Sequence, residues 1–218
     1  VKDNARRLID SGIGEIQVSF DGATKETYEK IRRKGRFDRV RQNCGLLNDY
    51  ANRKDRLYTR MWVVVQKDNR HQMEEFVKLA GSMRFRRLSF SLSLNDWGLE
   101  KWRTKNDGLQ TELNLTEEEN RRLLTIGKQE GVQVTVWRQA NKYNTKSPES
   151  LCPWVFKRPY VSCDLRLVPC CILGNPQACD LGDATDLQNM WNSESYRAFR
   201  RSHVEGRIPK VCQSCYEI

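Results

Sequence analysis

The stretch Leu88-Ser-Phe-Ser-Leu-Ser-Leu94 alternates strictly between apolar side chains and serine. Successive side chains of a β-strand point to opposite faces of its sheet, so the alternation predicts a strand with one apolar and one polar face. Residues 15–22, Glu-Ile-Gln-Val-Ser-Phe-Asp-Gly, repeat this pattern. Strands that are buried on both faces usually read as continuous apolar runs. We therefore expect a sheet that buries one face and keeps the other polar.

Segments with helical periodicity separate these strands from two others. The expected strands are 15–22, 57–66, 88–94 and 132–136, and the expected helices are 1–11, 24–47 with a break near Gly35, 73–80 and, after a polar loop, 116–131. The order αβαβαβαβ predicts an α/β fold with a parallel sheet covered by helices. The alternative is an antiparallel sheet with its polar face in water, which the long amphipathic helices between the strands disfavour.

The polar positions of the predicted strands include Gln17, Ser19, Ser89 and Ser91. If the apolar faces meet the helices, these polar side chains converge on the concave side of the sheet. A polar lumen fits an open barrel around a polar ligand better than a closed barrel packed with Val and Ile. Arg60 has the parity to project inward, and a position at the rim is the equal alternative.

The composition excludes some classes of protein. No apolar run approaches the ~20 residues that a membrane-spanning helix needs. The chain starts neither with Met nor with a signal peptide, and its first residues read as the middle of a helix. We therefore expect a C-terminal piece of a longer protein. The net charge is +10, and residues 30–41 hold seven basic side chains. Without an accompanying nucleic-acid motif such a stretch is usually a solvated helix face, so nucleic acid is not the expected partner.

The eight cysteines are unevenly distributed. Cys44 stands alone, and the other seven lie between Cys152 and Cys215. A secreted disulfide scaffold would be short and would carry cysteines throughout. A thiol-dense tail after an ordinary globular segment favours metal ligation in a reducing compartment, and hence a cytoplasmic location.

The tail predicts a β-hairpin whose first strand ends at Cys163, followed by helical pieces over 187–191 and 195–201. Cys212 and Cys215 can reach one metal centre from a tight turn, and Cys152 and Cys170 are well placed to add two more thiolates. Pro169 restricts the backbone before Cys170. Spacing alone leaves structural zinc and an iron–sulfur cluster equally favoured, whereas a disulfide within the vicinal pair Cys170-Cys171 is strained.

Several of these motifs resemble one family. They are the run Val18–Arg32 (VSFDGATKETYEKIR), Cys152-Pro-Trp, Val168-Pro-Cys-Cys171, Met190–Arg197 (MWNSESYR) and Pro209–Cys215 (PKVCQSC). Together they resemble radical S-adenosylmethionine (radical SAM) enzymes with a C-terminal SPASM or twitch extension. The resemblance implies the C-terminal part of a partial (β/α)6 TIM-like barrel over residues 1–146. A small cysteine-rich domain, a β-hairpin plus helices, would follow over residues 147–218.

The resemblance also implies the site residues and cofactors. Cys152, Cys170, Cys212 and Cys215 would bind one auxiliary four-iron four-sulfur (4Fe-4S) cluster, with Cys171 as the alternative to Cys170. Cys163 and Cys179 would be spare thiols. Three residues of the polar strand face would contact S-adenosylmethionine: Ser19 first, with Arg60 and Ser91 as weaker candidates.

Two features depart from the family. Leu165 stands where the hairpin usually has glycine, so we expect another turn type. The chain also lacks the CxxxCxxC loop of the catalytic 4Fe-4S cluster and the glycine-rich motif that follows it. We therefore expect about half the barrel and the catalytic cluster only in the full-length protein, and an inactive fragment.

The full-length protein would be a radical SAM oxidoreductase or maturase. It would abstract hydrogen from a peptide, sugar or small-molecule substrate, with electrons from a reductant such as flavodoxin or ferredoxin. The alternatives are a zinc-stabilised nucleic-acid-binding module and a non-catalytic iron–sulfur protein.

Overall fold

The computed structural model describes residues 2–54, 59–137 and 142–217. It divides the chain into two compact units, which are described separately. Unit 1 comprises Val1–Leu94 and Leu109–Arg138, and unit 2 comprises Asn95–Gly108 and Gln139–Ile218. Among the described residues, no helix combines the length and the apolar character that crossing a membrane requires.

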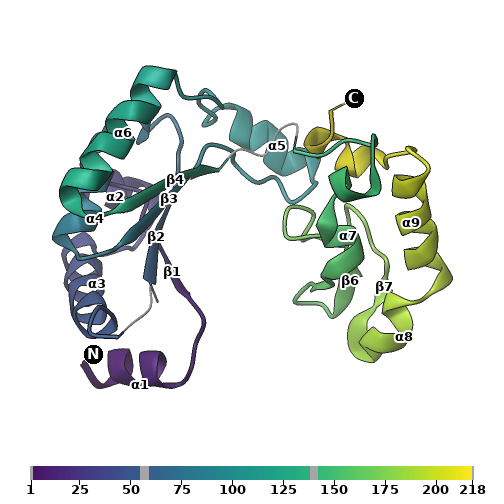
Figure 1. The fold of residues 1–218 in the computed structure, drawn as a ribbon, viewed down its shortest axis with the longest axis horizontal. Coiled ribbons are helices and arrows are strands. Elements are labelled where there is room, and N and C mark those ends of the chain that lie inside the picture. The colour runs from purple at the N-terminus through teal and green to yellow at the C-terminus, as the bar shows by residue number, and fades with distance from the viewer. Residues whose placement is uncertain (1, 55–58, 138–141, 218) are drawn as a thin grey trace. The chain divides into compact units, whose positions relative to one another are not determined.

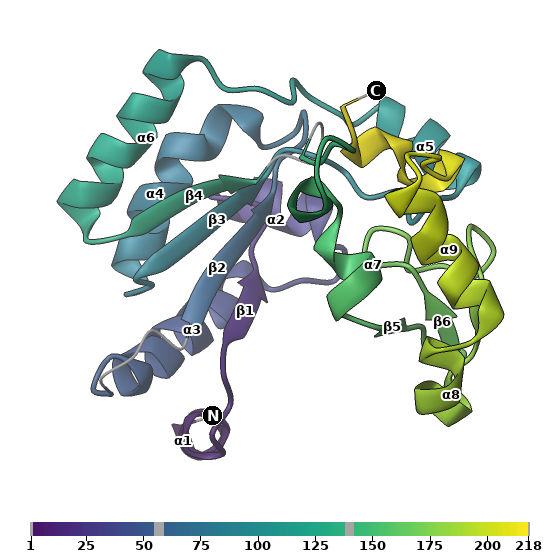
Figure 2. The ribbon, with the colours of Figure 1, turned by 45° about the vertical axis from the view of Figure 1, so that its right-hand side comes forward.

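Unit 1 is a parallel sheet with helices between its strands. Its elements are α1 (Lys2–Asp10), β1 (Ile16–Ser19), α2 (Lys25–Ile31), α3 (Phe37–Ala51), β2 (Thr59–Val64), α4 (Met73–Ser82), β3 (Arg87–Ser91), α6 (Glu117–Glu130) and β4 (Gln133–Trp137). The strands follow the chain in the order β1-β2-β3-β4, and each pairs in parallel with the next (Figure 2). The predicted α/β class and parallel sheet are confirmed.

The helices α3, α4 and α6 cover one face of this sheet (Figure 1). A parallel strand pair is joined by a right-handed crossover, so strands added in one direction place successive helices on the same face. This singly wound arrangement has no reversal of strand order within the four strands. The order therefore differs from that of a doubly wound sheet, in which the strand order reverses.

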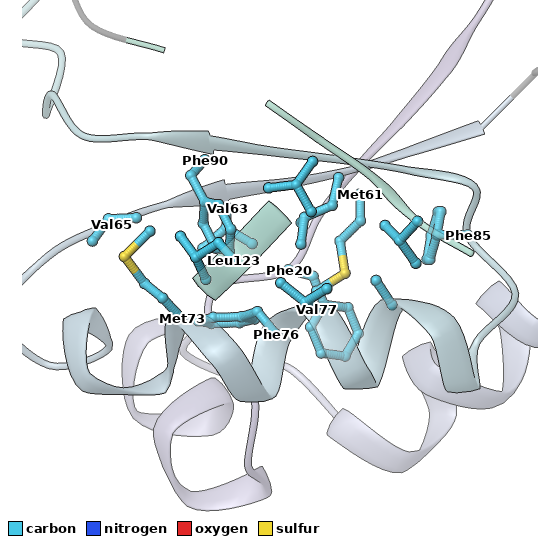
Figure 3. Packing of buried hydrophobic residues seen from close by; sticks show 14 of the residues in the cluster. Phe20, Met61, Val63, Val65, Met73, Phe76, Val77, Phe85, Phe90 and Leu123 are labelled. Carbon is cyan, nitrogen blue, oxygen red and sulfur yellow. The ribbon is translucent and has the colours of Figure 1, made fainter. Parts of the chain in front are cut away.

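The main core lies between the sheet and these helices. Phe90 and Met61 point from the strands toward Phe76 and Val77 of α4, and all four side chains are fully buried (Figure 3). The Phe76 and Phe90 rings meet edge to face, with centroids 6.1 Å apart. The alternation in 88–94 thus places Leu88, Phe90 and Leu92 in the core.

Local signals position the helices of unit 1 as the sequence predicts. Thr116 and Glu119 form the capping box at the start of α6, and Gly131 ends that helix with φ +66°. The break near Gly35 separates α2 from α3. Residue 1 of the first expected helix and residues 57 and 58 of the second expected strand lie outside the described residues.

Unit 2 contains short elements: α5 (Glu100–Asp107), α7 (Pro153–Lys157), β5 (Tyr160–Val161), β6 (Arg166–Val168), β7 (Gly182–Asp183), α8 (Leu187–Trp191) and α9 (Glu194–Val204). The strands form an antiparallel sheet in the order β5-β6-β7. The predicted hairpin is therefore present, and β7 adds a third strand that the sequence analysis missed. The polar loop expected before residue 116 contains α5.

The hairpin turn corrects one expectation. Leu165 adopts φ +54°, the left-handed conformation that glycine usually supplies, so the turn keeps this conformation without glycine. The Leu165 amide donates to the Ser162 carbonyl at 3.1 Å, and the Ser162 amide donates to the Arg166 carbonyl at 2.9 Å. These hydrogen bonds hold the turn closed and offset the backbone strain at Leu165.

Residues 95–108 join unit 2 through a close packing contact. Gly98 has φ +80°, and a Cβ at this position would lie 2.6 Å from the Cβ of Ala178. The Asn95 side-chain amide donates to the Cys171 carbonyl at 3.3 Å. This segment therefore packs on the loop that follows Cys170.

We expect Phe76→Ala to lower the free energy of unfolding by about 3–5 kcal/mol, because it removes a fully buried ring and leaves a cavity. Leu124→Ala on the neighbouring helix α6 is the control, since Leu124 is 44% exposed and the loss should stay within about 0.5 kcal/mol. Urea denaturation followed by circular dichroism measures both. Equal losses in the two variants would contradict the placement of the core.

Candidate metal centre

Four cysteines from three separate segments line one cavity in unit 2. Cys152 precedes α7, Cys170 follows β6, and Cys212 and Cys215 lie in a 3₁₀ turn over Lys210–Cys215. The remaining lining is mostly apolar and consists of Val155, Pro169, Ile172, Leu173, Val211, Ser214 and Tyr216. The structure thus brings together the four residues that were predicted as cluster ligands.

Local structure explains how each segment presents its thiol. Pro153 occupies the first position of α7, where a missing amide hydrogen costs nothing, and this fixes Cys152 at the helix start. Cys170 follows the buried pair Leu167 and Val168 of β6. In a 3₁₀ helix residues three apart eclipse each other, so the turn places Cys212 and Cys215 on one side.

Burial dominates the electrostatics of the four thiols. It raises the pKa of Cys170 to about 11 and raises the pKa of Cys152, Cys212 and Cys215. Repulsion from the Cys152 thiolate further raises the pKa of Cys170, Cys212 and Cys215. The free thiols are therefore neutral near pH 7, whereas a bound cationic centre would favour the thiolates.

Backbone amides partly oppose this effect at two of the sulfurs. The amides of Trp154 and Val155 face the Cys152 sulfur and lower the pKa of its thiol. The amides of Leu173 and Ile172 act in the same way on Cys170. Hydrogen bonds to ligand sulfurs are among the factors that set the potential of an iron–sulfur cluster.

The donor set and its surroundings fit an iron–sulfur cluster. Iron–sulfur clusters are held by cysteine thiolates, and the four thiols here face an apolar lining. The cavity has a volume of about 30 Å³, which holds roughly one or two water molecules. The side chains must therefore turn outward to admit a cluster. No three His, Cys, Asp or Glu side chains within residues 2–54, 59–137 and 142–217 are arranged to hold a single metal ion.

The other cysteines lie in different surroundings. The described cavity lining includes Cys170 but not Cys171, which favours Cys170 of the two alternatives. Cys163 is exposed, and its thiol lies 3.7 Å from the Asp164 carboxylate. Cys179 packs against a small core formed by Leu167, Leu181 and Tyr196. Cys44 is buried in unit 1, as predicted for an apolar helix residue.

Two tyrosines beside Cys152 were not predicted as site residues from the sequence. The Cys152 amide donates a hydrogen bond to the Tyr216 hydroxyl at 2.9 Å. The Tyr143 hydroxyl faces the Cys152 sulfur, and burial together with this thiol raises the pKa of Tyr143 well above its usual range. Tyr216 could have been suspected because it follows Cys215, whereas no local pattern singles out Tyr143.

The three residues predicted to contact S-adenosylmethionine lie in unit 1, whereas the four cysteines lie in unit 2. Ser19 and Ser91 are the last residues of β1 and β3, and they have the parity of the polar face. The Ser91 hydroxyl donates to the Ser93 carbonyl at 3.2 Å. Arg60 is the second residue of β2 and is held by Glu15 at 3.0 Å and by Ser89 at 2.8 Å.

Strand register decides where these three residues stand along the sheet. Arg60 pairs with Gln17, whereas Ser19 pairs with Trp62 and Ser91 pairs with Trp137. Ligands of parallel α/β sheets bind at the carboxyl ends of the strands. Ser19 and Ser91 lie at that end, and Arg60 lies nearer the amino end of its strand.

We expect alkylation of the reduced, metal-free protein to label the exposed Cys163 well before the buried Cys44. Cys44 is 3% exposed, and burial raises its pKa to about 11, so roughly one molecule in a thousand carries the reactive thiolate at pH 8. Its labelling rate should rise about tenfold per pH unit between pH 8 and 10. A pulse of iodoacetamide followed by peptide mass spectrometry measures this order. Equal rates at Cys163 and Cys44 would contradict it.

Comparison with known proteins identifies the region around this cavity. Residues 152–216 match the SPASM family, an iron–sulfur cluster-binding domain. No curated protein and no solved structure matches the chain. The match begins at Cys152 and ends one residue beyond Cys215, so it contains all four cysteines that line the cavity. The C-terminal part of the chain is thus similar to SPASM domains.

Proposed function

We propose that this chain is part of a radical SAM oxidoreductase or maturase and holds one auxiliary 4Fe-4S cluster. Cys152, Cys170, Cys212 and Cys215 are the proposed ligands. The observation that carries the proposal is that these four thiols line a single cavity inside the SPASM match. An all-cysteine set with irregular spacing is typical of iron–sulfur ligation.

The surroundings of the cavity suit a redox centre. A bound 4Fe-4S cluster supplies one-electron chemistry, and its potential depends on solvent exposure and on hydrogen bonds to the sulfurs. Val155, Leu173 and Tyr216 line the cavity and are at most 5% exposed, so they keep water away from the thiolates. The amides facing Cys152 and Cys170 compensate negative charge on these two ligands.

The radical SAM assignment rests on unit 1 and on the SPASM match. SPASM domains occur in radical SAM enzymes. Four parallel strands in chain order, with helices on one face, are what a stretch of (β/α)6 barrel wall would show. Its polar face would receive S-adenosylmethionine, with Ser19 and Ser91 at the carboxyl ends of their strands. Arg60 is the weaker contact, because Glu15 and Ser89 already bind it.

The wider reaction follows from this assignment. The catalytic cluster would be held outside these 218 residues, which contain no CxxxCxxC motif. The enzyme would act in the cytoplasm and take electrons from a flavodoxin or ferredoxin. It would abstract hydrogen from a peptide, sugar or small-molecule substrate, and the auxiliary site would accept an electron from the substrate or help to position it.

Anaerobic reconstitution of the chain with iron and sulfide tests the proposal. We expect about four irons and four sulfides per chain, together with broad absorbance in the blue. The result follows from four thiolates around one cavity. One zinc per chain without iron would contradict the proposal and support the zinc-stabilised alternative.

Cysteine variants test the ligand assignment. We expect Cys212→Ser to lose most of the reconstituted iron, because one of the four proposed ligand sulfurs is removed. Cys163→Ser is the matched control, since Cys163 lies in the same unit with an exposed side chain and should keep the wild-type iron content. Iron analysis and visible absorbance measure both. A Cys212→Ser variant with full iron content would exclude Cys212 as a ligand.

A further inference from the structure

A short segment outside the SPASM match pairs with the end that carries two of the cysteines. Tyr143 and Tyr216 form a parallel β-bridge. The Cys215 carbonyl accepts hydrogen bonds from the amides of Lys142 at 2.9 Å and Tyr143 at 3.1 Å, and the Glu217 amide donates to the Tyr143 carbonyl at 2.9 Å. The segment around Tyr143 therefore fixes the backbone on both sides of Tyr216.

The side chains of the same two tyrosines converge on Cys152. Their rings lie 5.7 Å apart, and Tyr216 is 3% exposed. The Tyr216 hydroxyl accepts the Cys152 amide hydrogen at 2.9 Å. The Tyr143 hydroxyl faces the Cys152 sulfur. Cys152 is thus held at its backbone by Tyr216, and its sulfur lies beside the Tyr143 hydroxyl.

A hydrogen bond to a ligand sulfur changes the balance between two oxidation states. Reduction adds negative charge to the cluster and its thiolates, and a hydroxyl that donates to a thiolate compensates that charge. The reduced state is therefore stabilised relative to the oxidised state, and the reduction potential rises. Groups that orient a metal ligand also raise the affinity for the metal, typically by about 10- to 100-fold.

We propose that Tyr143 is a positioning residue of the auxiliary cluster, acting through the Cys152 sulfur and through the backbone of Cys215. The inference rests on the proposed cluster site and adds to it a residue that lies before the matched domain. Tyr143 would raise the reduction potential of the cluster and slow its loss. The pairing with Cys215–Glu217 brings this hydroxyl to a ligand that is nine residues away in sequence.

The variant Tyr143→Phe tests the proposal in the 218-residue chain. Phenylalanine keeps the ring that packs on Tyr216 and removes only the hydroxyl. We expect the reconstituted variant to bind the wild-type amount of iron, to show a more negative midpoint potential and to release iron to a chelator about tenfold faster. Redox titration followed by electron paramagnetic resonance measures the potential, and absorbance loss in the presence of chelator measures the release.

Tyr160→Phe is the matched control. Tyr160 lies in β5 of the same unit, with its ring 6.5 Å from that of Trp154, and it does not belong to the described lining of the cavity. It should match the wild type in potential and in iron release. If Tyr143→Phe also matches the wild type while its iron is fully loaded, the role of Tyr143 is refuted and the cluster site stands. If wild-type protein binds no iron, the proposed function itself fails.

Discussion

The burial of four thiols around one cavity is the constraint on which unit 2 depends. The segments that carry these thiols have little regular structure, since α7 has five residues and β6 has three. Among the described residues, one small cluster of buried apolar side chains in this unit consists of Leu167, Leu181 and Tyr196, and other buried side chains, such as Val155 and Leu173, line the cavity beside the thiols. A small domain with so modest a core gains stability when a bound metal centre joins segments that are far apart in sequence. A cluster bound by the four thiols, as proposed, would therefore stabilise the fold of unit 2 as well as supply its chemistry.

Unit 1 obeys a different constraint, which explains why its fold could be predicted. Alternation with a period of two is a local property, so Phe90 and Leu92 could be assigned to the buried face from the sequence alone. The capping box at Thr116 and the glycine at 131 are also local signals. The helix α5 was missed because it has no apolar stripe, since its residues other than Trp102 are polar, and among its described side chains none is buried. The strand β7 was missed because two residues cannot show a period.

In the candidate site, too, the sequence predicted the features that depend on local spacing and missed those that depend on contacts between distant segments. The spacing of Cys212 and Cys215 is local and was sufficient to predict a shared centre. The hydrogen bond between Cys152 and Tyr216 joins residues 64 positions apart, and the contact of Asn95 with Cys171 joins residues 76 positions apart. Such contacts depend on how segments pack, so no pattern within one segment reports them. The left-handed Leu165 is a related case, because neighbouring hydrogen bonds stabilise a conformation that its residue type disfavours.

The polar face of the sheet in unit 1 has two ends with different chemistry. Near the amino ends of the strands, one Glu15 oxygen accepts both Arg60 at 3.0 Å and Arg87 at 2.9 Å. These three side chains are at most 32% exposed, so each arginine needs the carboxylate to compensate its charge. This ion-pair network holds β1, β2 and β3 together at that end. The carboxyl ends carry Ser19 and Ser91, whose side chains are small and neutral. Ligands of parallel α/β sheets bind at the carboxyl ends of the strands, so the proposed contacts with S-adenosylmethionine belong at this end and the ion pairs at the other.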